Sequence, residues 1–172
     1  MTQHDPDLAT PPPSLHLTVL RVNYLRGPNM WTYRPVLETW LDLGELEKWP
    51  SHTLPGFNDR LLTLLPQVGA HQCGLGKTGG FAERLQMGTW MGHVLEHIII
   101  ELIEMAGMEA GFGQTRETSS PGIYRMVFRV PDETVGRTAL GAGQALLQAV
   151  LDNDAFDLGQ AVEDIRTSID DN

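Results

Sequence analysis

The sequence predicts a single α+β domain, in which a small mixed sheet of about three or four strands packs with about five helices. Two observations carry this prediction. Segments with alternating apolar and polar residues occur near both ends of the chain, and segments with helical periodicity lie between and after them. Because strands and helices do not alternate regularly, the pattern argues against a doubly wound sheet. The 172 residues are enough for one compact domain with its own core.

The N-terminal part begins with a polar, Pro-rich segment, residues 1–14, which we expect to be a disordered lead-in. The folded domain should then occupy residues 15–170. Residues 15–25 and 35–43 alternate and are predicted to be strands, with a turn at Gly27-Pro28 between them.

The middle of the chain is predicted to be helical. The first helix follows Pro55 and ends at Pro66, and a Gly-rich loop at 69–80 precedes a short helix at 81–86. Residues 89–106 form the most apolar helical segment, with Thr89 as a plausible N-cap and Gly107 just past the end.

The C-terminal third is predicted to hold one strand and two helices. A loop that contains residues 115–118 leads to an alternating strand at 123–130. Asp132 can cap a helix that runs to about residue 152. An amphipathic helix then closes the chain, with its apolar face formed by Leu158, Val162, Ile165 and Ile169.

Composition excludes several classes of function. Twelve Lys and Arg against 22 Asp and Glu give a net charge of −10, which argues against binding to nucleic acid or to an anionic membrane. The single cysteine, Cys73, allows no internal disulfide, and the N-terminus does not resemble a signal peptide. We therefore expect a cytoplasmic protein.

The most informative pattern is His93-x-x-Glu96-His97, the H-x-x-E-H arrangement of the inverzincin metallopeptidases. Residues four apart lie on the same side of a helix, so the two imidazoles can bind one Zn²⁺. Glu96 lies beside them and is the candidate general base. The apolar residues of the same segment fall on its other side, so one face can be buried while the histidines line a cleft.

The third metal ligand has two candidates. Glu101 lies one turn beyond His97 on the same stripe, and Cys73 lies in the Gly-rich loop that precedes the helix. A thiolate is a good zinc ligand, although a lone cysteine is often only a small buried apolar residue. His71 is a weaker candidate. Cys73 is the sharper candidate for the third ligand, and Glu101 is the alternative.

Two arginine-bearing segments are candidates for substrate binding. Arg26 precedes a turn, and Arg116 and Glu117 lie in the predicted loop. Arginine beside turn residues can bind a carboxylate through two hydrogen bonds. A surface ion pair is the ordinary alternative for each of them.

Several motifs together resemble the N-terminal domain of cyanophycin synthetases. They are LRGPN-x-W at 25–31, LPGF at 54–57, GTWMGH-x-x-EH at 88–97, AGM at 106–108, GFG-x-TRET at 111–118 and PG-x-Y at 121–124. The resemblance covers roughly residues 17–165. One departure is that this family often has a second cysteine near the position of Lys77, which this chain lacks.

The resemblance implies a role with cyanophycin, a poly-aspartate chain that carries arginine on its side-chain carboxyls. It implies that the full enzyme is a homo-oligomer with an ATP-grasp domain and a Mur-ligase-like domain, which use ATP and Mg²⁺ and are absent here. The resemblance also implies that in some members the N-terminal domain is similar to a zinc metallopeptidase that cuts the polymer internally to supply primers. His93 and His97 would then hold the metal, with Cys73 nearby, and Glu96 would be the general base.

Two hypotheses follow. The domain is either a hydrolase that cleaves cyanophycin, or a non-catalytic module that anchors the polymer and keeps a structural or vestigial metal site. A complete set of three metal ligands favours hydrolysis.

Overall fold

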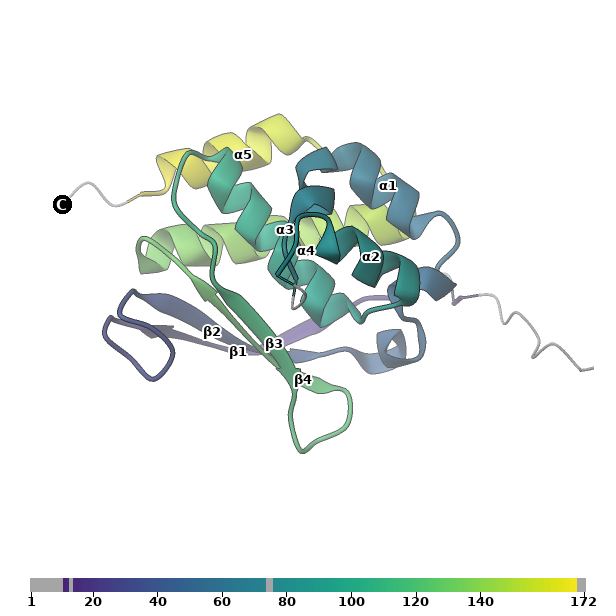
Figure 1. The fold of residues 1–172 in the computed structure, drawn as a ribbon, viewed down its shortest axis with the longest axis horizontal. Coiled ribbons are helices and arrows are strands. Elements are labelled where there is room, and N and C mark those ends of the chain that lie inside the picture. The colour runs from purple at the N-terminus through teal and green to yellow at the C-terminus, as the bar shows by residue number, and fades with distance from the viewer. Residues whose placement is uncertain (1–10, 13, 74–75, 170–172) are drawn as a thin grey trace, which may run out of the picture.

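The computed structural model describes residues 11–12, 14–73 and 76–169. Four strands form one sheet, and the helices cover one of its faces (Figure 1). The predicted α+β class is therefore confirmed. Most of the predicted disordered lead-in, residues 1–14, lies outside the described residues.

The sheet has the order β1-β2-β4-β3, and every neighbouring pair is antiparallel. It is thus simpler than the mixed sheet that the sequence suggested. Its strands are β1 (Thr18–Leu25), β2 (Val36–Asp42), β3 (Gly113–Glu117) and β4 (Ile123–Arg129). Three of them match predicted strands.

The prediction of a loop at residues 115–118 was wrong, because most of this segment belongs to β3. The strand reads GQTRE and lacks the apolar alternation by which a half-buried strand is recognised. It forms because β3 pairs along its length with β4, from Gly113 opposite Phe128 to Glu117 opposite Tyr124. Cross-strand hydrogen bonding decided this element, and that information is absent from the local sequence.

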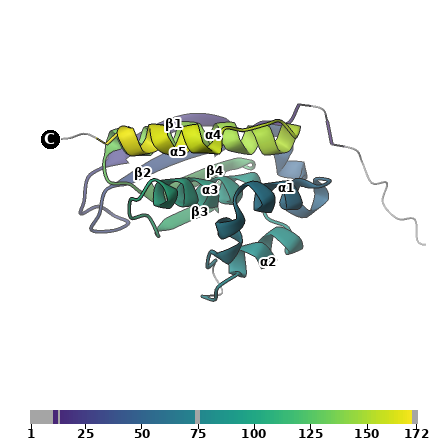
Figure 2. The same cartoon turned by 90° about the horizontal axis from the view of Figure 1, so that it is seen from above.

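The helical layer consists of five α-helices and three short 3₁₀ helices within the described residues. They are η1 (Gly44–Lys48), η2 (Ser51–Thr53), α1 (Phe57–Leu64), η3 (Pro66–Ala70), α2 (Gly80–Met87), α3 (Met91–Met105), α4 (Glu133–Asp152) and α5 (Leu158–Thr167). Seen from above, α2 lies on the β3 side of the molecule, away from β1 (Figure 2). None of the described helices is long and apolar enough to cross a membrane.

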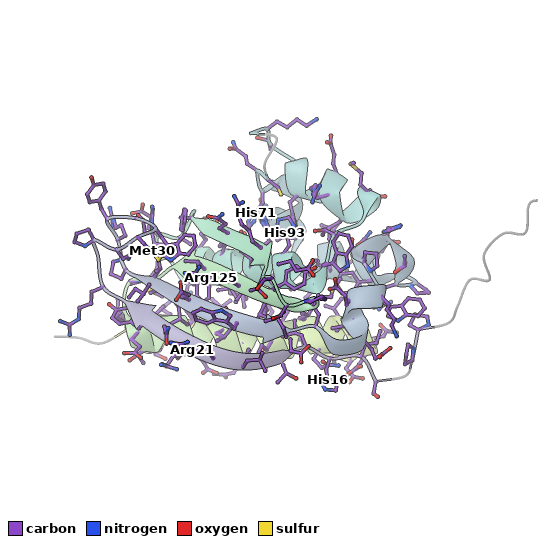
Figure 3. The ribbon with its side chains drawn as sticks, turned by 90° about the horizontal axis from the view of Figure 1, so that it is seen from below. His16, Arg21, Met30, His71, His93 and Arg125 are labelled. Carbon is purple, nitrogen blue, oxygen red and sulfur yellow. The ribbon has the colours of Figure 1, made fainter. Side chains whose placement is uncertain are left out.

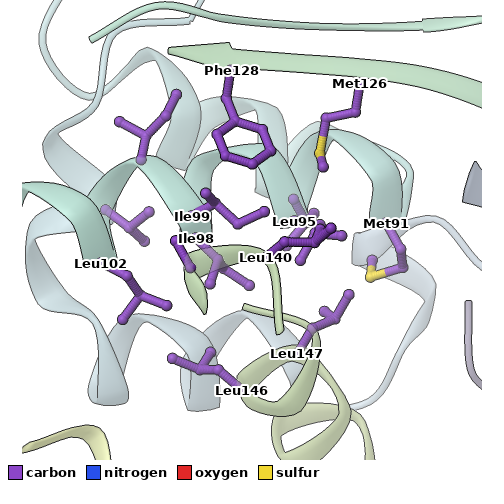
Figure 4. Packing of buried hydrophobic residues seen from close by; sticks show 14 of the residues in the cluster. Met91, Leu95, Ile98, Ile99, Leu102, Met126, Phe128, Leu140, Leu146 and Leu147 are labelled. Atoms are coloured by element: carbon purple, nitrogen blue, oxygen red, sulfur yellow. The ribbon is translucent and has the colours of Figure 1, made fainter. Parts of the chain in front are cut away.

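Helix α3 lies at the centre of the core. Its residues Leu95, Ile98, Ile99 and Leu102 are fully buried between β4 and α4 (Figure 4). Gly143 of α4 permits this packing, because a Cβ there would lie 2.7 Å from Ile99 Cγ1. Burying such side chains stabilises the fold by roughly 2 kcal/mol each, so α3 is a rigid support for any polar group on its remaining face.

Two of the three residues predicted at helix ends lie where the sequence placed them. Asp132 caps α4 as expected, since its carboxylate accepts a hydrogen bond from the Val135 amide at 2.8 Å. Gly107 has a φ of +85° just past the end of α3, as expected for a residue at that position. Thr89, however, is not the N-cap of α3. The helix begins at Met91 after the extended residue Trp90, and the Thr89 hydroxyl contacts His93 instead.

The sheet face opposite the helices carries a compact polar cluster. Glu38 accepts hydrogen bonds from Trp31 Nε1 at 3.2 Å and Arg125 Nε at 3.0 Å. The Arg125 guanidinium lies over the rings of Trp31 and Trp40, with its carbon 4.6 Å and 5.6 Å from their centroids. We call Trp31, Glu38, Trp40 and Arg125 the open-face cluster.

Candidate metal centre

Three elements bring the candidate ligands together. His93 and His97 project from the first two turns of α3, and Cys73 comes from the segment between η3 and α2. Phe81 of α2 stacks on the His97 ring with a centroid distance of 3.9 Å and meets the His93 ring edge-on at 5.4 Å. Since Phe81 is fully buried, it restricts the orientation of both imidazoles. His93 and His71 are labelled beside each other in Figure 3, and Arg21 lies farther away on the sheet.

The donor atoms of Cys73, His93 and His97 converge. The Nε2 atoms of the two histidines are 3.1 Å apart, and Cys73 Sγ lies 3.2 Å from His93 Nε2. One ligand atom from each residue lies within 4.8 Å of the other two. Two imidazole nitrogens and one thiolate suit Zn²⁺, and three protein ligands leave a position for water or substrate, as in catalytic zinc sites.

The other ring nitrogens are held by neighbouring residues. Thr89 Oγ1 lies 2.8 Å from His93 Nδ1, and His71 Nδ1 lies 3.0 Å from His97 Nδ1. His71 Nε2 in turn lies 2.7 Å from a carboxylate oxygen of Glu101. The hydrogen bonds are satisfied when His93 donates to Thr89, His97 donates to His71 and His71 donates to Glu101.

This assignment of protons leaves Nε2 of both candidate histidine ligands without a hydrogen. It leaves the Nε2 lone pairs of His93 and His97 facing each other, and a shared cation would stabilise that arrangement. Outer hydrogen bonds of this kind orient the ligands of zinc sites and fix their tautomers. The donor set and its surroundings therefore fit a zinc ion.

Burial keeps both histidines neutral, which is the form that binds a metal. Burial, with a smaller contribution from the nearby Arg84 guanidinium, lowers the pKa of His93 to about 4. Burial, with His93 and His71 close by, lowers the pKa of His97 to about 2. Burial also raises the pKa of the Cys73 thiol, so a bound metal ion is needed to hold the thiolate near neutral pH.

Glu96 is buried beside the candidate ligands. Thr115 Oγ1 donates a hydrogen bond of 2.5 Å to Glu96 Oε2 from β3. Burial raises the pKa of Glu96 to about 7, and the hydrogen bond from Thr115 opposes that rise. A carboxyl group with this pKa can both accept and release a proton near neutral pH. It lines the same pocket as Cys73, His93 and His97.

Gly113 determines how closely β3 approaches Glu96. A Cβ at this position would lie 2.6 Å from Glu96 Oε1 and 2.8 Å from Ile100 Cδ1. Neither contact is tolerable without a shift, so only glycine fits the observed spacing. The sequence contained Gly113 and Thr115 within one motif, but their role could not be inferred while β3 was taken for a loop.

The two candidates for the third ligand are separated in the structure. Cys73 groups with the histidine pair, whereas Glu101 groups with His71 and the exposed Glu104 as a second set of candidate ligands. His71 contacts both His97 and Glu101, and thus lies behind the histidine pair. The geometry favours Cys73 as the ligand and gives Glu101 an orienting contact.

Two pockets flank the candidate centre and share Cys73, His93 and Thr115. One has a volume of about 430 Å³ and is also lined by Glu96, His97 and residues of β3. The other, of about 500 Å³, is also lined by Arg84, Thr89, Trp90 and Tyr124. We refer to these two pockets, which adjoin at Cys73, His93 and Thr115, as the groove.

The predicted substrate-binding residues are distributed unevenly around this groove. Arg116 lines the pocket that holds Glu96. Glu117 contacts the Tyr124 hydroxyl at 3.4 Å, next to the other pocket. Arg26 lies in the loop between β1 and β2 and lines neither pocket.

Comparison with known proteins gives the family. Residues 38–152 match the family described as cyanophycin synthase-like N-terminal domain. The chain belongs to this family. It is 42% identical over 151 residues to the cyanophycin synthetases of Geminocystis herdmanii and Synechocystis sp., and 41% identical over 152 residues to that of Trichormus variabilis. Each match covers 87% of this chain and 17% of the relative, so the chain spans about a sixth of the length of these cyanophycin synthetases.

Proposed function

We propose that this domain is a zinc-dependent peptidase that cuts cyanophycin internally. The observation that carries the proposal is the convergence of Cys73, His93 and His97 in the pocket that also holds Glu96. Three zinc-binding side chains with a buried carboxyl group beside them are the minimum that a zinc peptidase needs.

The residues of this chain have separable roles in the proposed reaction. A bound zinc ion would supply Lewis-acid activation of water and of the scissile carbonyl. Glu96 would take the proton from the attacking water and transfer it to the leaving amide nitrogen. Thr115 would hold Glu96 through the hydrogen bond to Oε2, and Phe81 would keep the imidazoles in place.

The names of the relatives support the choice of substrate, and two carboxylates lie beside Tyr124, which lines one of the two pockets. Glu47 and Glu117 both contact the Tyr124 hydroxyl, at 3.3 Å and 3.4 Å. The second carboxylate oxygen of Glu47 is buried and has no hydrogen-bond partner in the described part of the chain. The Glu117 carboxylate is exposed, and an exposed carboxylate suits the guanidinium groups that cyanophycin carries. In the longer relatives, such cleavage would provide primers for the polymerising domains.

The test is a cleavage assay on the purified chain. We expect the unaltered chain, loaded with zinc, to shorten purified cyanophycin, and Glu96→Gln to leave the polymer intact while retaining zinc. A chain that binds one zinc ion and does not shorten the polymer would contradict the peptidase proposal and leave the anchoring module as the function. Equal shortening by both proteins would remove Glu96 from the mechanism.

A further inference from the structure

Strand β3 is an edge strand that lies directly beside the candidate metal centre. It pairs with β4 on one side, and the order of the sheet places it at the end opposite β1. Along this edge, β3 lines the pocket that holds Glu96, His93 and His97. An unpaired edge strand presents a row of amide and carbonyl groups to which an extended chain can bind.

The register of β3 shows which backbone groups face outward. The Arg129 amide donates to the Phe112 carbonyl at 3.0 Å, and the Thr118 amide donates to the Ile123 carbonyl at 2.8 Å. In an antiparallel pair the hydrogen-bonded residues alternate, so Gln114 and Arg116 also direct their backbone groups toward β4. The amides and carbonyls of Gly113, Thr115 and Glu117 therefore point away from β4, to an edge on which the described residues form no further strand.

These outward-facing residues are also the ones nearest the proposed catalytic group. Thr115 donates to Glu96, and Gly113 lies against the same carboxyl group. Gly113 lines the pocket that holds Glu96, and Thr115 lines both pockets, so these two residues border the groove beside the candidate ligands. A chain that pairs with Thr115 would pass the Glu96 carboxyl and the Cys73–His93–His97 set.

We propose that β3 binds the aspartate backbone of the polymer as an added fifth strand, with the peptide bond to be cut held opposite Thr115. The inference rests on the proposed function for its substrate, but concerns binding and not cleavage. The occupant is an extended peptide backbone, because only a chain with regularly spaced amides and carbonyls can use the free groups of an edge strand. Glu47 and Glu117, beside Tyr124, lie where they can accept hydrogen bonds from its guanidinium groups.

The direct test is amide hydrogen exchange, measured by NMR on the zinc-loaded Glu96→Gln protein with and without a short synthetic oligomer of aspartate that carries arginine on each side-chain carboxyl. We expect the Thr115 and Glu117 amides to gain protection of about tenfold or more on binding, since each becomes hydrogen-bonded. Gln114 and Arg116, which already face β4, should change much less. Amides on the outer edge of β1, at the other end of the sheet, are the internal control and should show no added protection.

A second measurement uses two oligomers that carry the same number of backbone N-methyl groups. In an extended chain, successive amides point to opposite edges of the strand. Methyl groups on alternate residues therefore leave all amides on one edge free to pair with β3, so this oligomer should bind almost as well as the parent. Methyl groups on consecutive residues block amides on both edges of the oligomer, and we expect its affinity for the protein to fall by about tenfold or more.

Three results would overturn the inference: no binding of the parent oligomer, no added protection at Thr115 and Glu117, or equal affinity for the two methylated oligomers. The outcome is independent of the peptidase proposal. If the β3 amides are protected but the unaltered protein does not cleave the polymer, the edge-strand site is supported and the peptidase proposal is contradicted. If the polymer is cleaved but the β3 amides gain no protection, the peptidase proposal is supported and the edge-strand site is contradicted.

Discussion

Two buried glutamates, on opposite sides of the sheet, differ in how their charge is compensated. Glu38 in the open-face cluster is 4% exposed, and Glu96 beside the candidate metal centre is 5% exposed. Glu38 is paired with the Arg125 guanidinium and also accepts from Trp31. Glu96 accepts from the neutral Thr115 hydroxyl, and burial raises its pKa to about 7.

The difference separates a structural carboxylate from a candidate catalytic one. A buried charge costs several kcal/mol unless it is paired, and Arg125 meets that requirement for Glu38. Glu96 is left with a weaker partner in the pocket that holds the candidate zinc ligands. A poorly compensated carboxyl group in a cleft is what proton transfer needs, whereas a fully paired one is unsuited to it.

The largest expected effect is on zinc binding. His93→Ala should lower the zinc content of the purified protein from about one equivalent to less than about a tenth, and should abolish cleavage, because two ligands cannot hold the ion tightly. Elemental analysis by mass spectrometry measures this directly. His16→Ala, at an exposed histidine outside the site, is the matched control and should retain the metal. Full zinc content in His93→Ala would contradict the ligand assignment.

The second effect concerns Glu96 alone. Glu96→Gln should reduce the rate of cleavage by about a hundredfold or more, as expected for loss of a general base. Zinc content should stay the same, and the free energy of unfolding should change by less than about 1 kcal/mol, since the amide oxygen can still accept from Thr115. Chemical denaturation and the cleavage assay together decide between a catalytic and a structural role.

The third effect concerns Glu38 on the other side of the sheet, where we expect a change in stability and no change in activity. Glu38→Ala should lower the free energy of unfolding by about 2 kcal/mol, because Arg125 and the Trp31 indole N–H lose their buried acceptor. The folded variant should still bind zinc and cleave at the normal rate. A loss of cleavage in a folded Glu38→Ala protein would show that the two clusters are coupled.

A smaller effect is expected at the contact between β3 and Glu96. Gly113→Ala should slow cleavage by about tenfold, because the added Cβ displaces β3 or the Glu96 carboxyl from its observed position. Gly141→Ala is the control, since a Cβ at that position of α4 has open space around it. Alanine there should be neutral or slightly stabilising, by up to about 1 kcal/mol.

The smallest effect should come from the acidic pair beside Tyr124. Glu47→Gln should raise the KM for the polymer by about threefold and leave kcat nearly unchanged, as for the loss of a single charged contact to substrate. The comparison with Glu45→Gln, at an exposed carboxylate paired with Lys48, separates a local contact from a general change in charge. Equal KM values for both variants would exclude Glu47 from substrate binding.

The sequence alone predicted the class of the fold and the central residues of the candidate site. Helical periodicity fixes the relation between His93, Glu96 and His97, because residues three and four apart must lie on neighbouring parts of one helix surface. The alternating segments at β1, β2 and β4 carry the strand signal in their own residues. Apolar residues on the remaining face of α3 required that face to be buried, as it is.

Only the tertiary structure decided what surrounds the two histidines. The sequence favoured Cys73 as the third ligand and left Glu101 as the alternative. In the structure the Cys73 thiol lies beside His93, while His71 contacts Glu101. Strand β3 has no apolar alternation and exists through its pairing with β4, so neither its free edge nor the contact from Thr115 to Glu96 could be foreseen. Local periodicity fixes positions within one element, whereas contacts between elements depend on how the whole chain packs.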